Sequence, residues 1–167
     1  MTIQIGDRLP EATLAEFIET ETEGCSLGPN TFNVADLVKG KTIAIFGLPG
    51  AFTPTCSAQH LPGYVKLADQ LKAKGVDEIW CVSVNDAFVM GAWGREQKAT
   101  GIVRMMADGS AVFTKALGLE FDLVAKGMGI RSKRYSMLVR DGVVEQLNLE
   151  AGGFDVSSAE KLLEQLG

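Results

Sequence analysis

The chain has 167 residues, of which 46% are hydrophobic and 22% are charged, and its formal net charge is −5. This composition fits one compact domain covering residues 1–167, and the acidic balance argues against a nucleic-acid surface, which needs clustered Lys and Arg. No run approaches the roughly 18 apolar residues of a membrane helix, and the first residues lack a signal-peptide core, so we expect a cytoplasmic protein without membrane attachment.

The first half of the chain predicts short N-terminal strands followed by a buried strand and a helix. Residues 1–40 are rich in Gly, Thr and Glu and poorly periodic, which is typical of short strands and loops, with a helical turn at 34–38. The nearly all-apolar segment 42–48 predicts a central strand covered on both faces. Apolar residues then recur at three- and four-residue spacing in a helix that ends near Gly75, and Pro62 should kink that helix.

The second half predicts another strand and helix, then a hairpin and a last helix. A buried strand at 78–84 precedes a helix at 86–99, whose inward residues are expected to be Phe88, Val89, Ala92 and Trp93. Alternating strands and helices indicate parallel pairing with right-handed crossovers.

Shorter signals complete the chain. A short strand at 103–107 and a short helix at 111–117 come first. Asp141-Gly142 between two apolar runs then predicts a two-residue hairpin, and the capping box Ser157-Ser158-Ala159-Glu160 predicts the start of the last helix. This order of elements predicts an α/β, thioredoxin-like fold, in which a central mixed β-sheet is flanked by helices and preceded by an N-terminal extension.

The octet Pro-Gly-Ala-Phe-Thr-Pro-Thr-Cys at 49–56 joins the first central strand to its helix. Thr53 suits the N-cap position, Pro54 suits the first helical position, and Cys56 then falls in the first turn. In that turn the free backbone N–H groups and the helix dipole favour a thiolate, which is the reactive form of cysteine. The octet therefore predicts a nucleophile.

The same residues resemble a known family. Pro49, Thr53 and Cys56 match the Pro-x-x-x-Thr-x-x-Cys signature of peroxiredoxins, and Arg134 stands before a hairpin strand, where this family keeps its active-site arginine. The longer strings resemble the type II, peroxiredoxin-5-like branch: GLPGAFTPTC at 47–56, HLPGY at 60–64, SVND at 83–86 and KRYSM at 133–137. The resemblance covers essentially the whole chain and implies a thiol peroxidase that reduces hydrogen peroxide and alkyl hydroperoxides.

The chemistry of peroxide reduction fits these residue types. A thiolate that attacks a peroxide must displace RO⁻ or HO⁻, so the site needs fixed donors for the developing charge. Arg134 offers a charged planar fork, the Thr53 hydroxyl is expected to donate to the thiolate or peroxide while capping the helix, and Pro49 forms an apolar wall. We expect Cys56 in a shallow pocket. The plainer alternatives are a structural thiol at 56, an exposed cation at 134 and a simple N-cap at 53.

The remaining cysteines and the single histidine have open roles. Cys81 is expected to be an inert thiol inside a strand, with a resolving cysteine as the alternative. His60 is interpreted as a packing or interface residue beside the site rather than a general base. Cys25 matches no position of the family. Because no C-x-x-C pair is present, we predict no disulfide framework, no metal site and no cofactor.

The absence of a cysteine at Asp155-Val156-Ser157-Ser158, where other members of the branch place a resolving cysteine, points to an external reductant. Glutathione with glutaredoxin is the first candidate and thioredoxin the second. A peroxide sensor that passes the oxidation of Cys56 to a protein partner is the alternative function. The resemblance also implies a homodimer packed near the active-site loops, to which apolar side chains of 88–93 are candidate contributors.

Overall fold

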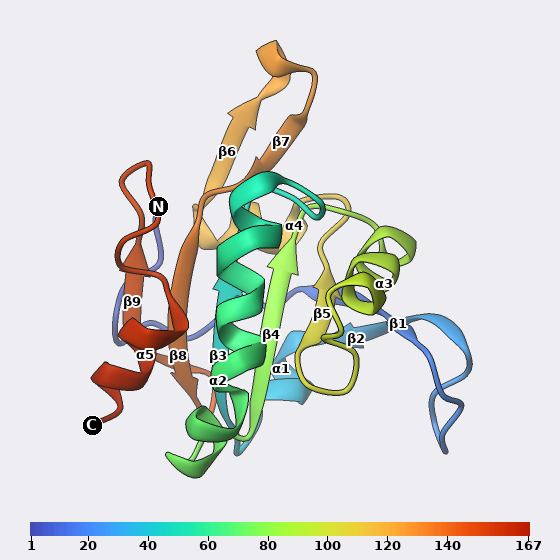
Figure 1. The fold of residues 1–167 in the computed structure, drawn as a ribbon, viewed down its shortest axis with the longest axis horizontal. Coiled ribbons are helices and arrows are strands. Elements are labelled where there is room, and N and C mark those ends of the chain that lie inside the picture. Colours follow the sequence, from blue (N-terminus) through green and yellow to red (C-terminus); the bar gives the residue numbers. More distant parts are fainter.

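The computed structural model describes residues 1–167, arranged as helices around a central sheet (Figure 1). The strands are β1 (Thr13–Ile18), β2 (Gly28–Asn33), β3 (Thr42–Gly47), β4 (Glu78–Ser83), β5 (Arg104–Ala107), β6 (Glu120–Leu123), β7 (Gly129–Ser132), β8 (Tyr135–Arg140) and β9 (Val143–Leu149). The helices are α1 (Val34–Val38), the π-helix η1 (Cys56–His60), α2 (Leu61–Ala73), α3 (Ala87–Glu96), α4 (Val112–Leu117), the 3₁₀-helix η2 (Val124–Lys126) and α5 (Ala159–Gln165).

The main sheet has seven strands in the order β2-β1-β5-β4-β3-β8-β9. Parallel pairing joins β3 to β4 and β4 to β5, whereas β8 is antiparallel to both β3 and β9. The predicted hairpin is confirmed, and its turn residues Asp141 and Gly142 have φ angles of 48° and 81°, as a primed two-residue turn requires. The thioredoxin-like fold with a mixed sheet is therefore confirmed.

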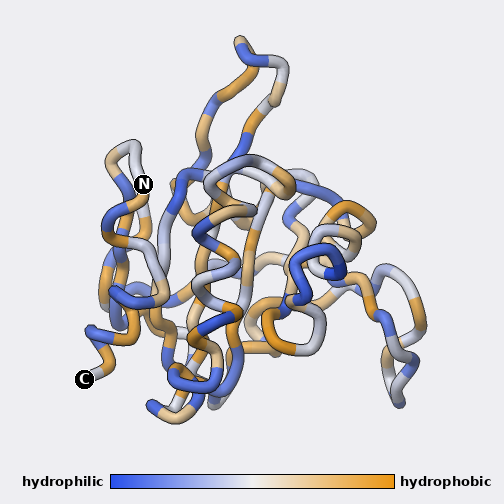
Figure 2. Tube along the Cα trace, viewed as in Figure 1, coloured by the Kyte–Doolittle hydropathy of each residue, from blue (hydrophilic) through white to orange (hydrophobic).

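Apolar side chains cover both faces of the sheet. Alternate residues of β3 enter opposite cores: Phe46 packs with α2, α3 and α5 on one face, and Ile45 packs with α1 and α4 on the other. Figure 2 shows hydrophobic and hydrophilic stretches alternating along α2, as expected for a helix buried on one side. No helix of the structure combines the length and apolar character needed to cross a membrane.

Helix α3 buries only part of the face that its sequence predicts: Val89 packs against the core, but Phe88 does not. Phe88 was expected inward but is 64% exposed, while Trp93 is buried as expected. Gly91 explains the difference, because a Cβ there would lie 2.8 Å from the Phe17 Cβ. The glycine lets α3 approach β1 closely, and this close approach selects the face that carries Met90 and Trp93.

The last helix begins one residue later than the predicted capping box. Ser158, not Ser157, is the N-cap of α5, and its side chain accepts a hydrogen bond from the Lys161 N–H. The Ser157 N–H and hydroxyl both donate to Glu150, so its side chain is turned toward that carboxylate and makes no cap bond to the helix. The capping-box prediction was therefore wrong in register, although the helix itself is present.

The hairpin of β6 and β7 was not predicted at all. Its strands pair only with each other, and Figure 1 shows them projecting away from the main body. Apolar residues such as Phe121 and Val124 remain exposed on it, so the segment lacks the in-and-out alternation by which a strand is recognised from sequence.

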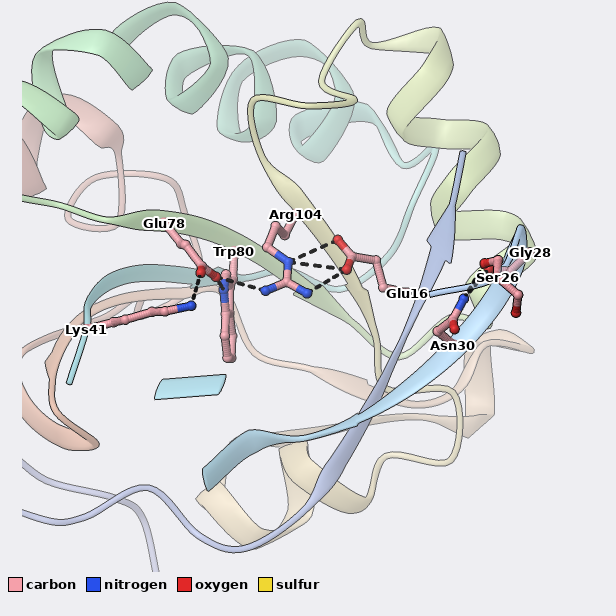
Figure 3. A network of polar contacts seen from close by, with 8 residues as sticks. All are labelled: Glu16, Ser26, Gly28, Asn30, Lys41, Glu78, Trp80 and Arg104. Atoms are coloured by element: carbon pink, nitrogen blue, oxygen red, sulfur yellow. Dashed lines mark hydrogen bonds and ion pairs between the residues drawn. The ribbon is translucent and has the colours of Figure 1, made fainter. Parts of the chain in front are cut away.

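An ion-pair network ties the sheet together at the amino-terminal ends of its parallel strands. Arg104 at the start of β5 binds Glu16 of β1 and Glu78 of β4, and Glu78 also pairs with Lys41 (Figure 3). The carboxyl ends of the parallel strands lie at the opposite end of the sheet, where the octet 49–56 follows β3. This ion-pair network and the octet thus lie at opposite ends of the sheet.

Candidate active site

Cys56 lies at the start of the helix that follows β3, as predicted, but in an unusual turn. Residues 54 and 55 are α-helical, and Cys56 opens the π-helix η1, in which the Leu61 N–H bonds to the Cys56 carbonyl. Pro62 has no N–H to donate to an α-helical partner four residues earlier, which favours the wider turn. The predicted disturbance at Pro62 thus takes the form of a π-turn directly after the cysteine.

Thr53 closes the turn before the helix, but not as predicted. Its hydroxyl donates to the Gly50 carbonyl at 2.7 Å, and it accepts no helix N–H. The first helical bond runs from the Ser57 N–H to the Thr53 carbonyl, and the N–H groups of Thr55 and Cys56 make no backbone hydrogen bond. Two amides and the positive end of the helix therefore remain available beside the sulfur.

Side chains from neighbouring elements hold the octet in a strained conformation. Phe52 has a φ of 64°, a left-handed conformation that costs a bulky residue about 1–3 kcal/mol. The Ala51 N–H donates to the Asn85 side chain at 2.9 Å, and Trp93 of α3 donates to the Ser57 hydroxyl at 3.0 Å. These contacts with the β4–α3 region offset the strain and fix the position of Cys56.

Arg134 binds both Cys56 and His60 through its two terminal nitrogens. Its Nη2 lies 3.2 Å from the Cys56 Sγ, and its Nη1 lies 2.9 Å from the His60 Nδ1. Because a guanidinium can only donate, Nδ1 must be the unprotonated nitrogen of the ring, and Nε2 carries the hydrogen. Burial, assisted by the charge of Arg134, lowers the pKa of His60 to about 3. His60 is therefore neutral and its Nδ1 already accepts a hydrogen bond from Arg134, which fits the prediction that it is not a general base.

The loop before α5 completes this network. The Ser157 carbonyl accepts from the His60 Nε2 and from the Tyr64 hydroxyl, both at 3.0 Å. Phe154 of the same loop lies 5.0 Å from the His60 ring and 5.9 Å from the Arg134 guanidinium carbon. The arginine and histidine are thus enclosed by a loop that lies almost a hundred residues after His60 and about twenty after Arg134 in sequence.

Pro49 and Arg134 line a surface pocket of about 430 Å³, together with Phe121, Leu149 and Glu150. The Pro49 carbonyl is held at 3.2 Å by Arg131, which also donates to the Met128 carbonyl at 2.8 Å. Cys56 itself is 0% exposed, so the expectation that it lies in a shallow pocket was wrong. The pocket reaches Arg134, whose Nη2 contacts the Cys56 Sγ, while the sulfur itself is covered.

The other two cysteines lie in different surroundings. Cys81 is fully buried in β4 between Phe46 and Met105 of the neighbouring strands, and burial raises the pKa of its thiol. Cys25 is half-buried beside a bridge to Thr22 in the N-terminal segment. All three cysteines are free thiols.

Sequence reasoning missed three contributors to this site. Arg131 was visible only as part of a basic cluster, and Glu150 and Tyr64 gave no functional signal. Glu150 follows β9 directly, and its N–H donates to the Arg134 carbonyl at 3.0 Å, so the hairpin register places it opposite the arginine. The predicted hairpin combined with the predicted arginine was the available clue to Glu150.

Comparison with known proteins gives one consistent family. A sequence model described as Redoxin matches residues 4–163. The rice (Oryza sativa subsp. japonica) protein named Peroxiredoxin-2E-2, chloroplastic, is 51% identical over 99% of this chain and 73% of its own length. Reduced Prx3 from Vibrio vulnificus, solved in complex with H₂O₂, is 53% identical over 99% of this chain and 100% of that one, with a TM-score of 0.92.

A crystal structure from Burkholderia cenocepacia is 64% identical, covers 100% of this chain and 99% of that one, and has a TM-score of 0.98. Its description assigns that protein provisionally to the thioredoxin reductases. The family model and the named relatives disagree with that description, and this chain carries no C-x-x-C pair.

The expectation of a cytoplasmic location is contradicted by the relatives. Both the rice protein and an Arabidopsis thaliana relative, 47% identical and named Peroxiredoxin-2E, chloroplastic, carry plastid names. The prediction was made from the composition of the first residues, and that composition does not determine the compartment.

Proposed function

The chain belongs to the redoxin family and within it to the type II peroxiredoxins, which are thiol-dependent peroxidases, and we propose that Cys56 is its peroxide-reducing thiol. One observation carries this proposal: the Arg134 Nη2 lies 3.2 Å from the Cys56 Sγ. Arg134 forms no ion pair with a carboxylate, so its charge is directed at the sulfur and at whatever binds there.

In the proposed reaction the Cys56 thiolate attacks one oxygen of ROOH. An S–O bond forms to the oxygen that carries the hydrogen as the O–O bond breaks, the leaving RO⁻ takes a proton from water to become ROH, and Cys56 is oxidised to sulfenic acid. Arg134 and the free amides of Thr55 and Cys56 stabilise the charge on the leaving oxygen, each well-placed donor contributing about 3 kcal/mol. Because the Thr53 hydroxyl gives its hydrogen to Gly50, its role becomes that of an acceptor for the peroxide O–H.

The substrates we propose are hydrogen peroxide and alkyl hydroperoxides. The H₂O₂ complex of the Vibrio vulnificus relative supports the first. The second is supported by the pocket beside Arg134, because Pro49, Phe121 and Leu149 offer apolar walls to an organic group.

An external thiol is the proposed reductant. One thiol condenses with the sulfenic acid and releases water, and a second thiol cleaves the mixed disulfide, so two reductant thiols end as a disulfide. Burial and a raised pKa make Cys81 a poor internal partner. Glutathione with glutaredoxin is the reductant we favour, ahead of thioredoxin.

We also propose that residues 1–167 act as one redoxin domain that forms a homodimer. The family match from 4 to 163 supports the single domain. Phe88 on α3, 64% exposed, and Phe52, 51% exposed and packed 6.4 Å from Trp93, support an apolar contact surface near the octet.

Peroxide consumption with and without glutathione and glutaredoxin tests this function. We expect catalytic turnover by the wild type, none by Cys56→Ser, and most of the wild-type rate from Cys81→Ser. Equal loss in both variants would contradict an external reductant acting on Cys56 alone. Stoichiometric oxidation of Cys56 without turnover, whether glutathione with glutaredoxin or thioredoxin is supplied, would favour the peroxide sensor instead.

A further inference from the structure

The carboxylate of Glu150 gathers hydrogen bonds from the loop that precedes α5. Its donors are the N–H groups of Asp155, Val156 and Ser157 at 2.8–2.9 Å and the Ser157 hydroxyl at 2.6 Å. Burial opposes the charge, but these bonds hold the pKa of Glu150 below its ordinary value. A half-buried carboxylate with this many donors organises the loop around itself.

This loop is connected to the sulfur by a continuous chain of hydrogen bonds. The Ser157 carbonyl binds the His60 Nε2–H at 3.0 Å, the His60 Nδ1 accepts from the Arg134 Nη1 at 2.9 Å, and the Arg134 Nη2 reaches Cys56 at 3.2 Å. Each link constrains the next, because the bond at Nε2 selects the ring tautomer that leaves Nδ1 free to accept.

The proposed catalytic mechanism does not use Glu150, which touches neither the sulfur nor the leaving oxygen. Yet the carboxylate fixes the Ser157 carbonyl from one side, and the ladder bond from its N–H fixes the Arg134 carbonyl from the other. Glu150 therefore fixes Ser157 and Arg134, the two ends of the hydrogen-bond relay Ser157–His60–Arg134 that orients the guanidinium toward Cys56.

We infer that Glu150 is a positioning residue for peroxide reduction, acting through Ser157 and His60 on the orientation of Arg134 toward Cys56. This inference rests on the proposed role of Cys56. It gives a function to the loop at 150–157, which has no cysteine. The loop sets the geometry for peroxide reduction by Cys56 and takes no part in the later reduction of the sulfenic acid.

The test compares Glu150→Ala with Glu150→Gln and with Ser158→Ala. Ser158→Ala removes the cap of α5 next to the loop, so it destabilises the same region while leaving the bonds to Glu150 in place. The readouts are the second-order rate constant for oxidation by H₂O₂, followed by stopped-flow tryptophan fluorescence, and the free energy of unfolding in urea.

We expect Glu150→Ala to slow oxidation about tenfold, less than the loss of a donor at the reacting centre, because Arg134 remains present but is oriented less well toward Cys56. Glu150→Gln keeps one acceptor oxygen and should recover most of the rate, and Ser158→Ala should stay within about twofold of wild type. In a His60→Ala background, Glu150→Ala should have little further effect, because the relay is already broken.

Equal slowing by Glu150→Ala and Ser158→Ala at equal loss of stability would overturn the inference, and so would a full tenfold effect in the His60→Ala background. Failure of the wild type to oxidise Cys56 with H₂O₂ would instead refute the proposed function. The variants therefore test the role of Glu150, and the wild type in the same experiment tests the proposed function.

Discussion

The burial of His60 predicts a specific loss of stability in mild acid. The pKa of His60 is about 3 in the folded chain, against 6.5 for the free side chain. Between these two values the unfolded chain binds a proton that the folded chain does not, so the free energy of unfolding falls as the pH falls. One pKa unit corresponds to about 1.4 kcal/mol, so a change from pH 7 to pH 5 should remove about 2 kcal/mol.

Urea unfolding at pH 7 and pH 5 measures this loss, and His60→Gln is the matched control. A glutamine can donate to the Ser157 carbonyl and accept from Arg134, but it does not titrate. Since this is the only histidine of the chain, the variant should lose only a few tenths of a kcal/mol over the same range. Parallel losses of stability in wild type and variant would refute the reasoning, because the acid sensitivity would then come from other groups.

Two further predictions concern the proposed catalytic arginine and the proposed contact surface. Arg134→Lys keeps the charge but loses the planar fork that binds His60 and Cys56 together. Oxidation by H₂O₂ should therefore slow about a hundredfold in stopped-flow experiments. A rate within fivefold of wild type would contradict a need for both bonds. Phe88→Asp places a charge on the proposed dimer surface and should shift the mass measured by light scattering from dimer to monomer. Phe121→Asp on the β6–β7 hairpin should leave the mass unchanged, and a persistent dimer in Phe88→Asp would place the contact elsewhere.

The elements with strong periodicity were predictable, and those that depend on tertiary contacts were not. The buried strand β3 is predicted by its apolar run, and the hairpin is predicted by Asp141-Gly142, a turn that needs positive φ. Phe88 was wrongly placed on the inward face of α3, because the close approach of Gly91 to Phe17 that selects the buried face is visible only in the fold. The N-cap of α5 was predicted one residue too early, because the bonds that tie Ser157 to Glu150 depend on how the loop between them folds.

The same division applies to the site. Cys56 and Arg134, predicted from a helix start and a family signature, lie 3.2 Å apart in the structure. The bond from the Thr53 hydroxyl to the Gly50 carbonyl was not predicted, because the position of that carbonyl depends on the fold of the octet. His60 was placed beside the site, but the bonds that make it part of the relay come from Arg134 and Ser157, far away in the chain.

The complete burial of Cys56 has a kinetic consequence for the cycle of this peroxiredoxin. With no exposed surface on the residue, a small peroxide needs only a side-chain movement to meet the sulfur, whereas a tripeptide or protein thiol needs the π-turn to open. Opening then becomes a first-order step that precedes reduction. At high reductant concentration the turnover rate should reach a plateau set by the protein's own motion, even if no stable complex with the reductant ever forms.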